Sequence, residues 1–175
     1  MITKWLKQAV KVNTIASGGT AYSFNIPVKI TNGQTRYLGA GNYLNIGNFT
    51  SIQLNAVNLG ISVGTSDTPA TDEDYVLGST ITSGLSGVIT NTHGMDNDDP
   101  YVIFNVVLSN STSSDIIVKE IGYKQNLYGA SSPNVTSGLG GVAVLLDRTV
   151  LDTPLTVPAR GNAALQYKLK CSYSF

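Results

Sequence analysis

The sequence predicts an all-β protein, an antiparallel β-sandwich of jelly-roll or Ig-like Greek-key topology. Charged residues make up only 13% of the 175 residues, about half the usual share. Small polar residues and 18 glycines take their place, and such residues favour turns and half-exposed strands over helices. About ten to twelve short strand-like runs, separated by turn signals, complete the pattern of a sandwich or barrel.

The first 13 residues predict either an N-terminal arm or a short helical turn packed on the same domain. Residues 14–175 are expected to form one domain, because no repeat or shift in composition divides them. Large aromatic residues are enriched where interfaces bind most strongly. The candidate interface residues are Trp5, Leu6, Lys7, Tyr37 and Tyr43.

Residues 22–30 alternate between apolar and polar side chains, which indicates a strand with one exposed face. Pro27 lacks a backbone N–H, so this strand should lie at an edge or carry a bulge. Asn32 and Gly33 predict a tight turn after it. Shorter strands are expected within 36–48, at 50–55 and at 57–63.

A short helical turn is expected near residues 71–77. Thr71 can cap it, and the acids Asp72, Glu73 and Asp74 would lie in its first turn.

The middle of the chain predicts a strand at 86–92, an exposed loop at 94–100 and a strand at 101–108. The last of these is the most apolar run, so we expect it to be central and buried on both faces. A tight turn at 110–115 should return the chain as a hairpin over 115–124.

The C-terminal part predicts a mobile loop at 127–141, strands at 142–151 and 155–157, and a final strand. In that last strand the odd-numbered residues from Ala163 to Phe175 are apolar and the even-numbered ones mostly polar, so one face should join the core. Asp147 and Arg148 stand in an apolar strand, where they are expected to form an ion pair or an interface pair.

The composition of the chain excludes several functions. Eleven basic residues match eleven acidic ones, so no basic surplus is available to neutralise nucleic-acid phosphates. No apolar run is long enough for a transmembrane helix. One cysteine, Cys171, and one histidine, His93, provide no disulfide, zinc cluster or nucleophile–base pair. We expect no enzymatic activity.

Three acids, Asp96, Asp98 and Asp99, lie on one loop and raise the question of calcium. Their spacing lacks the Gly and Glu positions of an EF-hand loop. A solvated acidic loop is therefore expected, with no bound metal or cofactor. Four further acids on or beside strands cannot be paired from the sequence: Asp115, Glu120, Asp147 and Asp152.

Two segments resemble virion proteins of tailed bacteriophages. Residues 63–77 (VGTSDTPATDEDYVL) are similar to a recurring Gly-Thr-rich turn followed by Pro and a short acidic turn. Residues 102–157 resemble a second pattern, with an Asn-Ser/Thr turn, a Glu-Ile-Gly strand (VKEIG, 118–122) and then Leu-x-x-Arg-x-Val-Leu-x-x-Pro (145–154).

The resemblance implies a structural virion component, most specifically a capsid auxiliary or decoration protein that binds the head lattice. Its partners would be the major capsid protein or other virion proteins, and it would act as a homo-oligomer without nucleic acid or membrane. It would be assembled in the host cytoplasm into the virion. The alternatives are a neck, tail or head-fibre component, or a carbohydrate- or receptor-binding module.

Overall fold

Nine β-strands make up the described part of the computed structural model, which covers residues 26–38, 43–44, 54, 60–96, 99–128 and 142–170. They are β1 (Ile26–Lys29), β2 (Thr35–Leu38), β3 (Tyr43–Leu44), β4 (Gly60–Gly64), β5 (Leu85–Asp96), β6 (Asp99–Asn110), β7 (Ile116–Tyr128), β8 (Val142–Val157) and β9 (Asn162–Lys170). These residues contain no helix, and hence none that could span a membrane. The predicted all-β class is confirmed.

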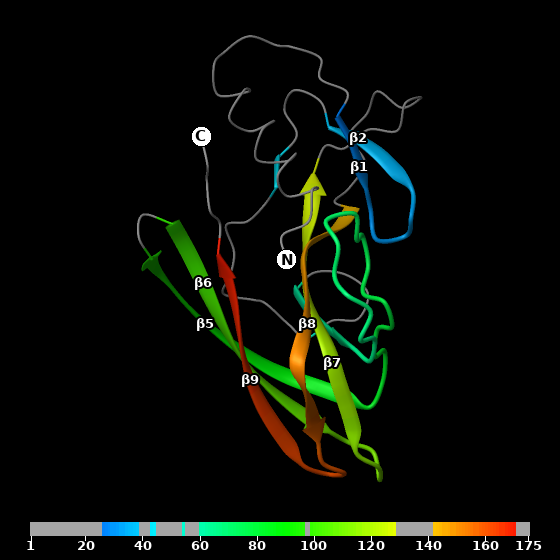
Figure 1. Cartoon of the computed structure of the whole chain (residues 1–175), viewed down its shortest axis with the longest axis vertical. Coiled ribbons are helices and arrows are strands. Elements are labelled where there is room, and N and C mark those ends of the chain that lie inside the picture. Colours follow the sequence, from blue (N-terminus) through cyan, green and yellow to red (C-terminus); the bar gives the residue numbers. More distant parts are fainter. Residues whose placement is uncertain are drawn as a thin grey trace.

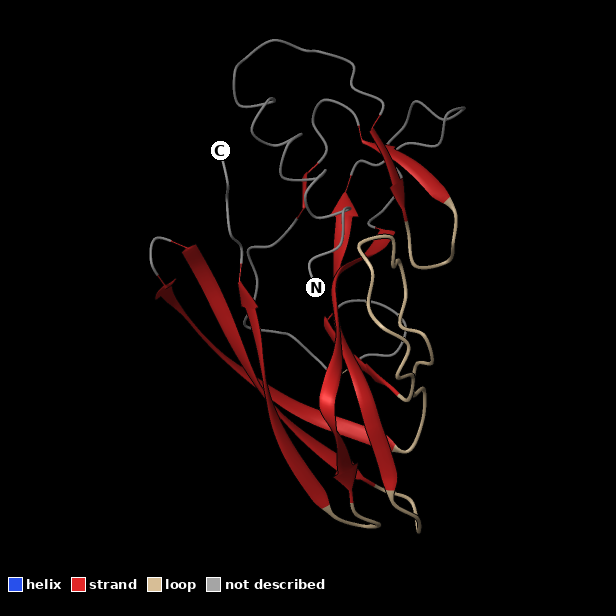
Figure 2. Ribbon diagram, in the orientation of Figure 1, coloured by secondary structure: helices blue, strands red, loops and turns tan. Residues whose placement is uncertain are grey.

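The strands form two antiparallel layers (Figures 1 and 2). The first layer, the β6 sheet, has the order β5-β6-β9. In the second layer, the β7 sheet, β7 pairs with β3, β4 and β8. In Figure 1 the two sheets meet at the lower end of the molecule and diverge upward. The short β1-β2 hairpin forms a separate two-stranded sheet.

The hydrophobic core lies between these two layers. Phe104 of the β6 sheet contacts Tyr123 of the β7 sheet, with ring centroids 5.2 Å apart, and stacks on Tyr167 at 6.0 Å. Both sheets contribute Val, Ile and Leu side chains that are almost completely buried around these rings. Period-two alternation places the apolar side chains of each strand on the facing surfaces.

The apolar run at 101–108 is not buried on both faces as predicted, whereas β4 and the middle of β7 are. Burial alternates along β6, and Val107 on its outer face is 43% exposed. In β7 all residues from 120 to 125 are buried, including Glu120 and Lys124. The physical reason is a third layer: the segment 65–80, here named the covering segment, is hydrogen-bonded to the outer side of the β7 sheet.

The turn after β6 connects the two sheets. The predicted hairpin between 101–108 and 115–124 is wrong, because β6 pairs with β5 and β9, whereas β7 lies in the other layer. The side-chain amide of Asn110 donates to the carbonyls of Ser114 (2.8 Å) and Val157 (3.1 Å). Since Val157 ends β8, these bonds hold the end of β6 against the opposite sheet and direct the chain across.

The helical turn expected near 71–77 is a single turn and not a helix. The Asp74 carboxylate accepts hydrogen bonds from the backbone N–H (2.9 Å) and hydroxyl (3.0 Å) of Thr71, as in a capping box. The backbone N–H of Gly78 then donates to Glu120 at 3.0 Å. The chain is thereby drawn onto the sheet, and no further turn follows.

The smaller predictions have mixed outcomes. The turn at Asn32 and Gly33 is confirmed, with Gly33 at a φ of +83°, and the strand containing Pro27 belongs to a two-stranded sheet, in which both strands are edges. The loop predicted at 94–100 is shorter, because β5 and β6 extend to Asp96 and Asp99. In β9 the predicted inward face is confirmed as far as Leu169. Cys171 and residues 129–141 of the expected loop lie outside the described residues.

Strand β8 is continuous where two strands were expected. Its pairing with β7 shifts between Val118 and Glu120, where one residue of β7 faces a longer stretch of β8 that contains Pro154. A strand can carry a proline at such an irregularity because no ladder hydrogen bond is lost there.

Candidate functional site

The most elaborate polar arrangement surrounds the guanidinium of Arg148, which is 2% exposed. Its Nε donates to Glu120 Oε2 at 2.7 Å, its Nη1 to Asp74 Oδ2 at 2.8 Å, and its Nη2 to the carbonyl of Thr68 at 3.0 Å. The planar fork of an arginine suits such convergent acceptors. Arg148 thus joins β8, β7 and the covering segment.

Glu120 is completely buried, and its carboxylate is satisfied by more than Arg148. It accepts the backbone N–H groups of Ser79 (2.7 Å), Gly78 (3.0 Å) and Ser66 (3.3 Å). A buried carboxylate is tolerated only with such compensation. The sequence alone does not pair Glu120 with any partner, because its backbone donors lie about forty to fifty residues upstream and Arg148 lies 28 residues downstream.

Electrostatics confirm that Asp74 belongs to the same network. Burial by itself would raise the pKa of Asp74, but hydrogen bonds from Arg148 and Thr71 outweigh it and hold the pKa below its usual range. Burial by itself would lower the pKa of Arg148, but hydrogen bonds to the carboxylates of Asp74 and Glu120 raise it. Asp74 and Arg148 therefore stay charged, and their ion pair fastens the covering segment to the β7 sheet.

Asp147 and Arg148 do not pair with each other, because neighbouring residues of a strand point to opposite faces. Arg148 points to the covering segment, whereas Asp147 accepts hydrogen bonds from the hydroxyls of Tyr167 and Thr149. Burial, together with the charge of Asp147, raises the pKa of Tyr167 well above its usual range. The predicted pairing of Asp147 with Arg148 is therefore wrong, and Arg148 forms its ion pairs with Glu120 and Asp74, which are distant in sequence.

A further buried ionisable group is Lys124 in β7, which is 4% exposed. Burial lowers the pKa of Lys124 to about 8.

Asp96 and Asp99, where β5 ends and β6 begins, form ion pairs with lysines of β9. Asp96 lies 3.3 Å from Lys170 and 3.4 Å from Lys168, and Asp99 lies 3.3 Å from Lys170. Hydrogen bonds from Lys170 and Lys168 lower the pKa of Asp96. Within the described residues, which exclude Asp98, no three His, Cys, Asp or Glu side chains gather as a metal site would require.

The other predicted residues are only partly placed. His93 is an exposed residue of β5. Tyr37 pairs with Pro27 in the β1-β2 hairpin, and Tyr43 in β3 pairs with Tyr128, but the side chains of both tyrosines lie outside the described part. The predicted interface residues Trp5, Leu6 and Lys7 also lie outside it.

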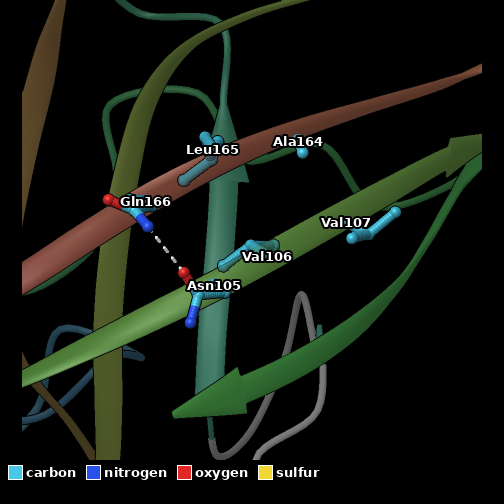
Figure 3. Close-up of a pocket in the computed structure, with 6 residues that line it drawn as sticks. All are labelled: Asn105, Val106, Val107, Ala164, Leu165 and Gln166. Atoms are coloured by element: carbon cyan, nitrogen blue, oxygen red, sulfur yellow. Dashed lines mark hydrogen bonds between the residues drawn. The ribbon is translucent and has the colours of Figure 1, made fainter. Parts of the chain in front are cut away.

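The outer face of the β6 sheet is the candidate interaction surface. Its exposed apolar side chains include Val88, 69% exposed, and its cross-strand neighbour Val107. An open hollow of about 250 Å³ lies on the sheet between β6 and β9 (Figure 3). It is lined by Asn105, Val106, Val107, Ala164, Leu165 and Gln166.

Two amide side chains define the polar side of this hollow. Gln166 Nε2 donates to Asn105 Oδ1 at 2.9 Å, and Figure 3 shows the two groups turned toward each other. The alternation in β9 indicates that Gln166 points outward, whereas the outward position of Asn105 was not predicted, because 101–108 was expected to be buried on both faces. The pairing of β6 with β9 was not predicted, since the two residues are 61 positions apart.

No protein-family model, curated protein or solved structure matches the chain.

Proposed function

We propose that the chain is a structural component of a tailed-phage virion, most specifically a capsid auxiliary or decoration protein that binds the head lattice. The observation that carries this proposal is that the motifs behind the resemblance meet in one buried network. Glu120 comes from the Glu-Ile-Gly strand, Arg148 from the Leu-x-x-Arg pattern, and Asp74 from the acidic turn.

The identities of the motif residues are explained by packing. A Cβ at Gly122 would lie 2.6 Å from the Leu77 side chain, so the glycine lets the covering segment approach the sheet. Glu120 and Arg148 are engaged with backbone groups and with each other. Motifs that build a fold in this way support a structural role in preference to a catalytic one.

The surface chemistry also supports a protein partner. The chain has no net charge, and its outer β6-sheet face combines Val88 and Val107 with amides, hydroxyls and the side chain of Lys168. Such a mixture is typical of non-obligate protein interfaces.

The proposal is tested on density-gradient-purified particles of a phage that encodes this chain. Mass spectrometry should detect the chain in a fixed ratio to the major capsid protein, and cryo-electron microscopy should locate it on the head. A chain that is abundant in the lysate but missing from the particles would contradict the virion proposal. Density on the neck, tail or fibres would replace the head assignment by the first alternative.

We further propose that residues 1–13 act as a docking arm through Trp5, Leu6 and Lys7. Deleting residues 1–7 should leave the melting curve nearly unchanged and abolish incorporation into particles. Loss of folding would instead support a packed first turn, and normal incorporation would refute the arm.

A carbohydrate-binding role is the second candidate, and it rests on the amides of Asn105 and Gln166 in the hollow. The nearby Tyr101 is poorly placed to stack on a sugar, since Lys168 Nζ lies over its ring at 4.2 Å. Binding on a glycan array that is lost in Gln166→Ala would favour this role.

A further inference from the structure

The outer face of the β6 sheet presents its side chains in cross-strand rows, each with one residue from β5, β6 and β9. The register of the three strands places Val88, Val107 and Ala164 side by side in one such row. All three are exposed. An apolar row that crosses the whole sheet is therefore open to solvent in the single chain.

This apolar row carries both a projection and a depression. Val88, with most of its surface exposed, projects from β5. The hollow described above lies on the other side of the row, between β6 and β9, where Val107 and Ala164 form its apolar wall and Asn105 and Gln166 its polar side (Figure 3). The face thus contains an apolar side chain and, at the same level, a recess that suits such a side chain.

The charges of this face are divided between its two sides. Asp96 lies at the end of β5, and Lys168 and Lys170 lie on β9. These side chains form ion pairs across β6, but each of them is still at least 35% exposed. They can therefore attract a second surface that presents lysines opposite Asp96 and an acid opposite the lysines.

We propose that the outer face of the β6 sheet is the dimerisation surface of this protein and packs on the same face of a second copy, about a two-fold axis parallel to β6. This axis lays β5 of each copy over β9 of the other. Val88 of each copy then enters the hollow of the other copy, and the acidic side of each face meets the lysine side of the other. A two-fold interface uses the same patch on both subunits, so each of these contacts is formed twice. Asn105, near the middle of β6, lies beside the axis.

The size of the face is sufficient for a reversible dimer. Twelve strand residues at about 3.4 Å each, and three strands about 4.8 Å apart, give a face of about 40 by 14 Å. Two such faces cover about 1,100 Å² in total, which is just above the lower limit of about 1,000 Å² for a specific interface. We therefore expect an association that depends on concentration and not an obligate dimer.

The test is sedimentation equilibrium of the full chain, from micromolar to near-millimolar concentration. The wild type should move from the 18.5 kDa mass of one chain toward twice that mass. Val88→Lys carries a charge into the hollow and Ala164→Arg fills the hollow, so each should weaken association by about tenfold or more. The matched control is Ile117→Lys, because Ile117 is also a β-branched strand residue, 49% exposed, but belongs to the β7 sheet. It should associate as the wild type does.

A wild type that stays monomeric over this range would overturn the proposal, and failure of Val88→Lys to join particles would then assign the face to the head lattice. Association that is unchanged in both Val88→Lys and Ala164→Arg, or equally weakened in Ile117→Lys, would also overturn it, because another surface would be responsible. Far-UV circular dichroism checks that each variant is folded.

If the charged variants do not fold, crosslinking decides. In a Cys171→Ser background, a short bis-maleimide reagent should join Asn105→Cys into a covalent dimer, since sheets packed face to face lie about 10 Å apart, and should not join Ile117→Cys. No crosslinked dimer at position 105 would refute the proposed axis. These measurements need only the isolated chain, so dimer formation and incorporation into virions can fail separately.

Discussion

Replacing Arg148 by methionine should weaken the fold substantially, because Arg148 connects the covering segment to the sheet. The substitution keeps an unbranched side chain and removes the guanidinium. The hydrogen bonds to Glu120 (2.7 Å), Asp74 (2.8 Å) and the carbonyl of Thr68 (3.0 Å) are lost. Glu120, with no exposed surface, is left buried with its charge no longer paired.

Removing one partner of a buried ion pair costs about 3–5 kcal/mol. The lower end applies here, because backbone N–H groups such as those of Gly78 and Ser79 still bind the Glu120 carboxylate. The side chain of Asp74 is also 20% exposed and can gain water. A loss of about 3 kcal/mol corresponds to a melting temperature lower by roughly 6–12 °C for a chain of this size.

Urea and thermal unfolding followed by circular dichroism measure this loss, and amide hydrogen exchange at Gly78 and Ser79 reports on release of the covering segment. The double variant Arg148→Met/Glu120→Gln should be less destabilised than the two single effects together, since it removes the buried charge. The matched control is Lys119→Ala, which breaks the exposed pair with Asp67 (2.8 Å) on the same segment. It should change stability little.

A loss in Arg148→Met no larger than that in Lys119→Ala would refute the fastening role. The pH dependence gives a second check. Because the pKa of Asp74 is lowered in the folded state, its contribution is complete above the unfolded value of about 3.9 and is lost as the pH falls through the folded pKa. That acid-dependent loss should be smaller in Arg148→Met, because Arg148 is a main cause of the lowered pKa.

Three further outcomes are expected. Lys124→Met should raise the unfolding free energy at pH 7 by about 1–3 kcal/mol. Since burial lowers the pKa of Lys124 to about 8, the wild type gains stability from pH 8 to 10. A difference in unfolding free energy between variant and wild type that stays unchanged over that range would contradict the explanation. Leu169→Ala truncates a core side chain that is 7% exposed and should lower the unfolding free energy by about 2–5 kcal/mol in denaturant titrations. Lys168→Ala, on the opposite face, should lower it much less, and equal effects would reject the assigned faces. Millimolar calcium should leave the melting temperature unchanged, because Asp96 is already paired with Lys168; a rise of many degrees would favour a calcium-dependent binding module.

Secondary structure was predictable where apolar and polar side chains alternate clearly along a strand. The alternation in β9 identified Leu169 as inward and Lys168 as outward, since a residue's face follows from its parity alone. The turn at Asn32 and Gly33 was predictable for a similar reason: a positive φ, +83° at Gly33, is a local property of the backbone.

The candidate surface was predictable only in part. The outward residues of β9 could be named from its alternation, but the run at 101–108 was expected to be buried on both faces, so the outward position of Asn105 and its contact with Gln166 came from the structure. Likewise the sequence shows that β5 contains no Lys, Arg, Glu or Pro, but only the sheet order places that strand at the end of its sheet within the described residues.

The sequence by itself determined that this protein is all-β, which residues of its alternating strands face the core, and where its tight turns lie. Those properties depend on neighbours within a few positions. The tertiary structure alone decided that β7, with Glu120 and Lys124, is buried on both faces while the more apolar β6 is not. Burial is set by what covers a strand, and the cover of β7 arrives from about forty residues upstream, where Gly78 donates to Glu120.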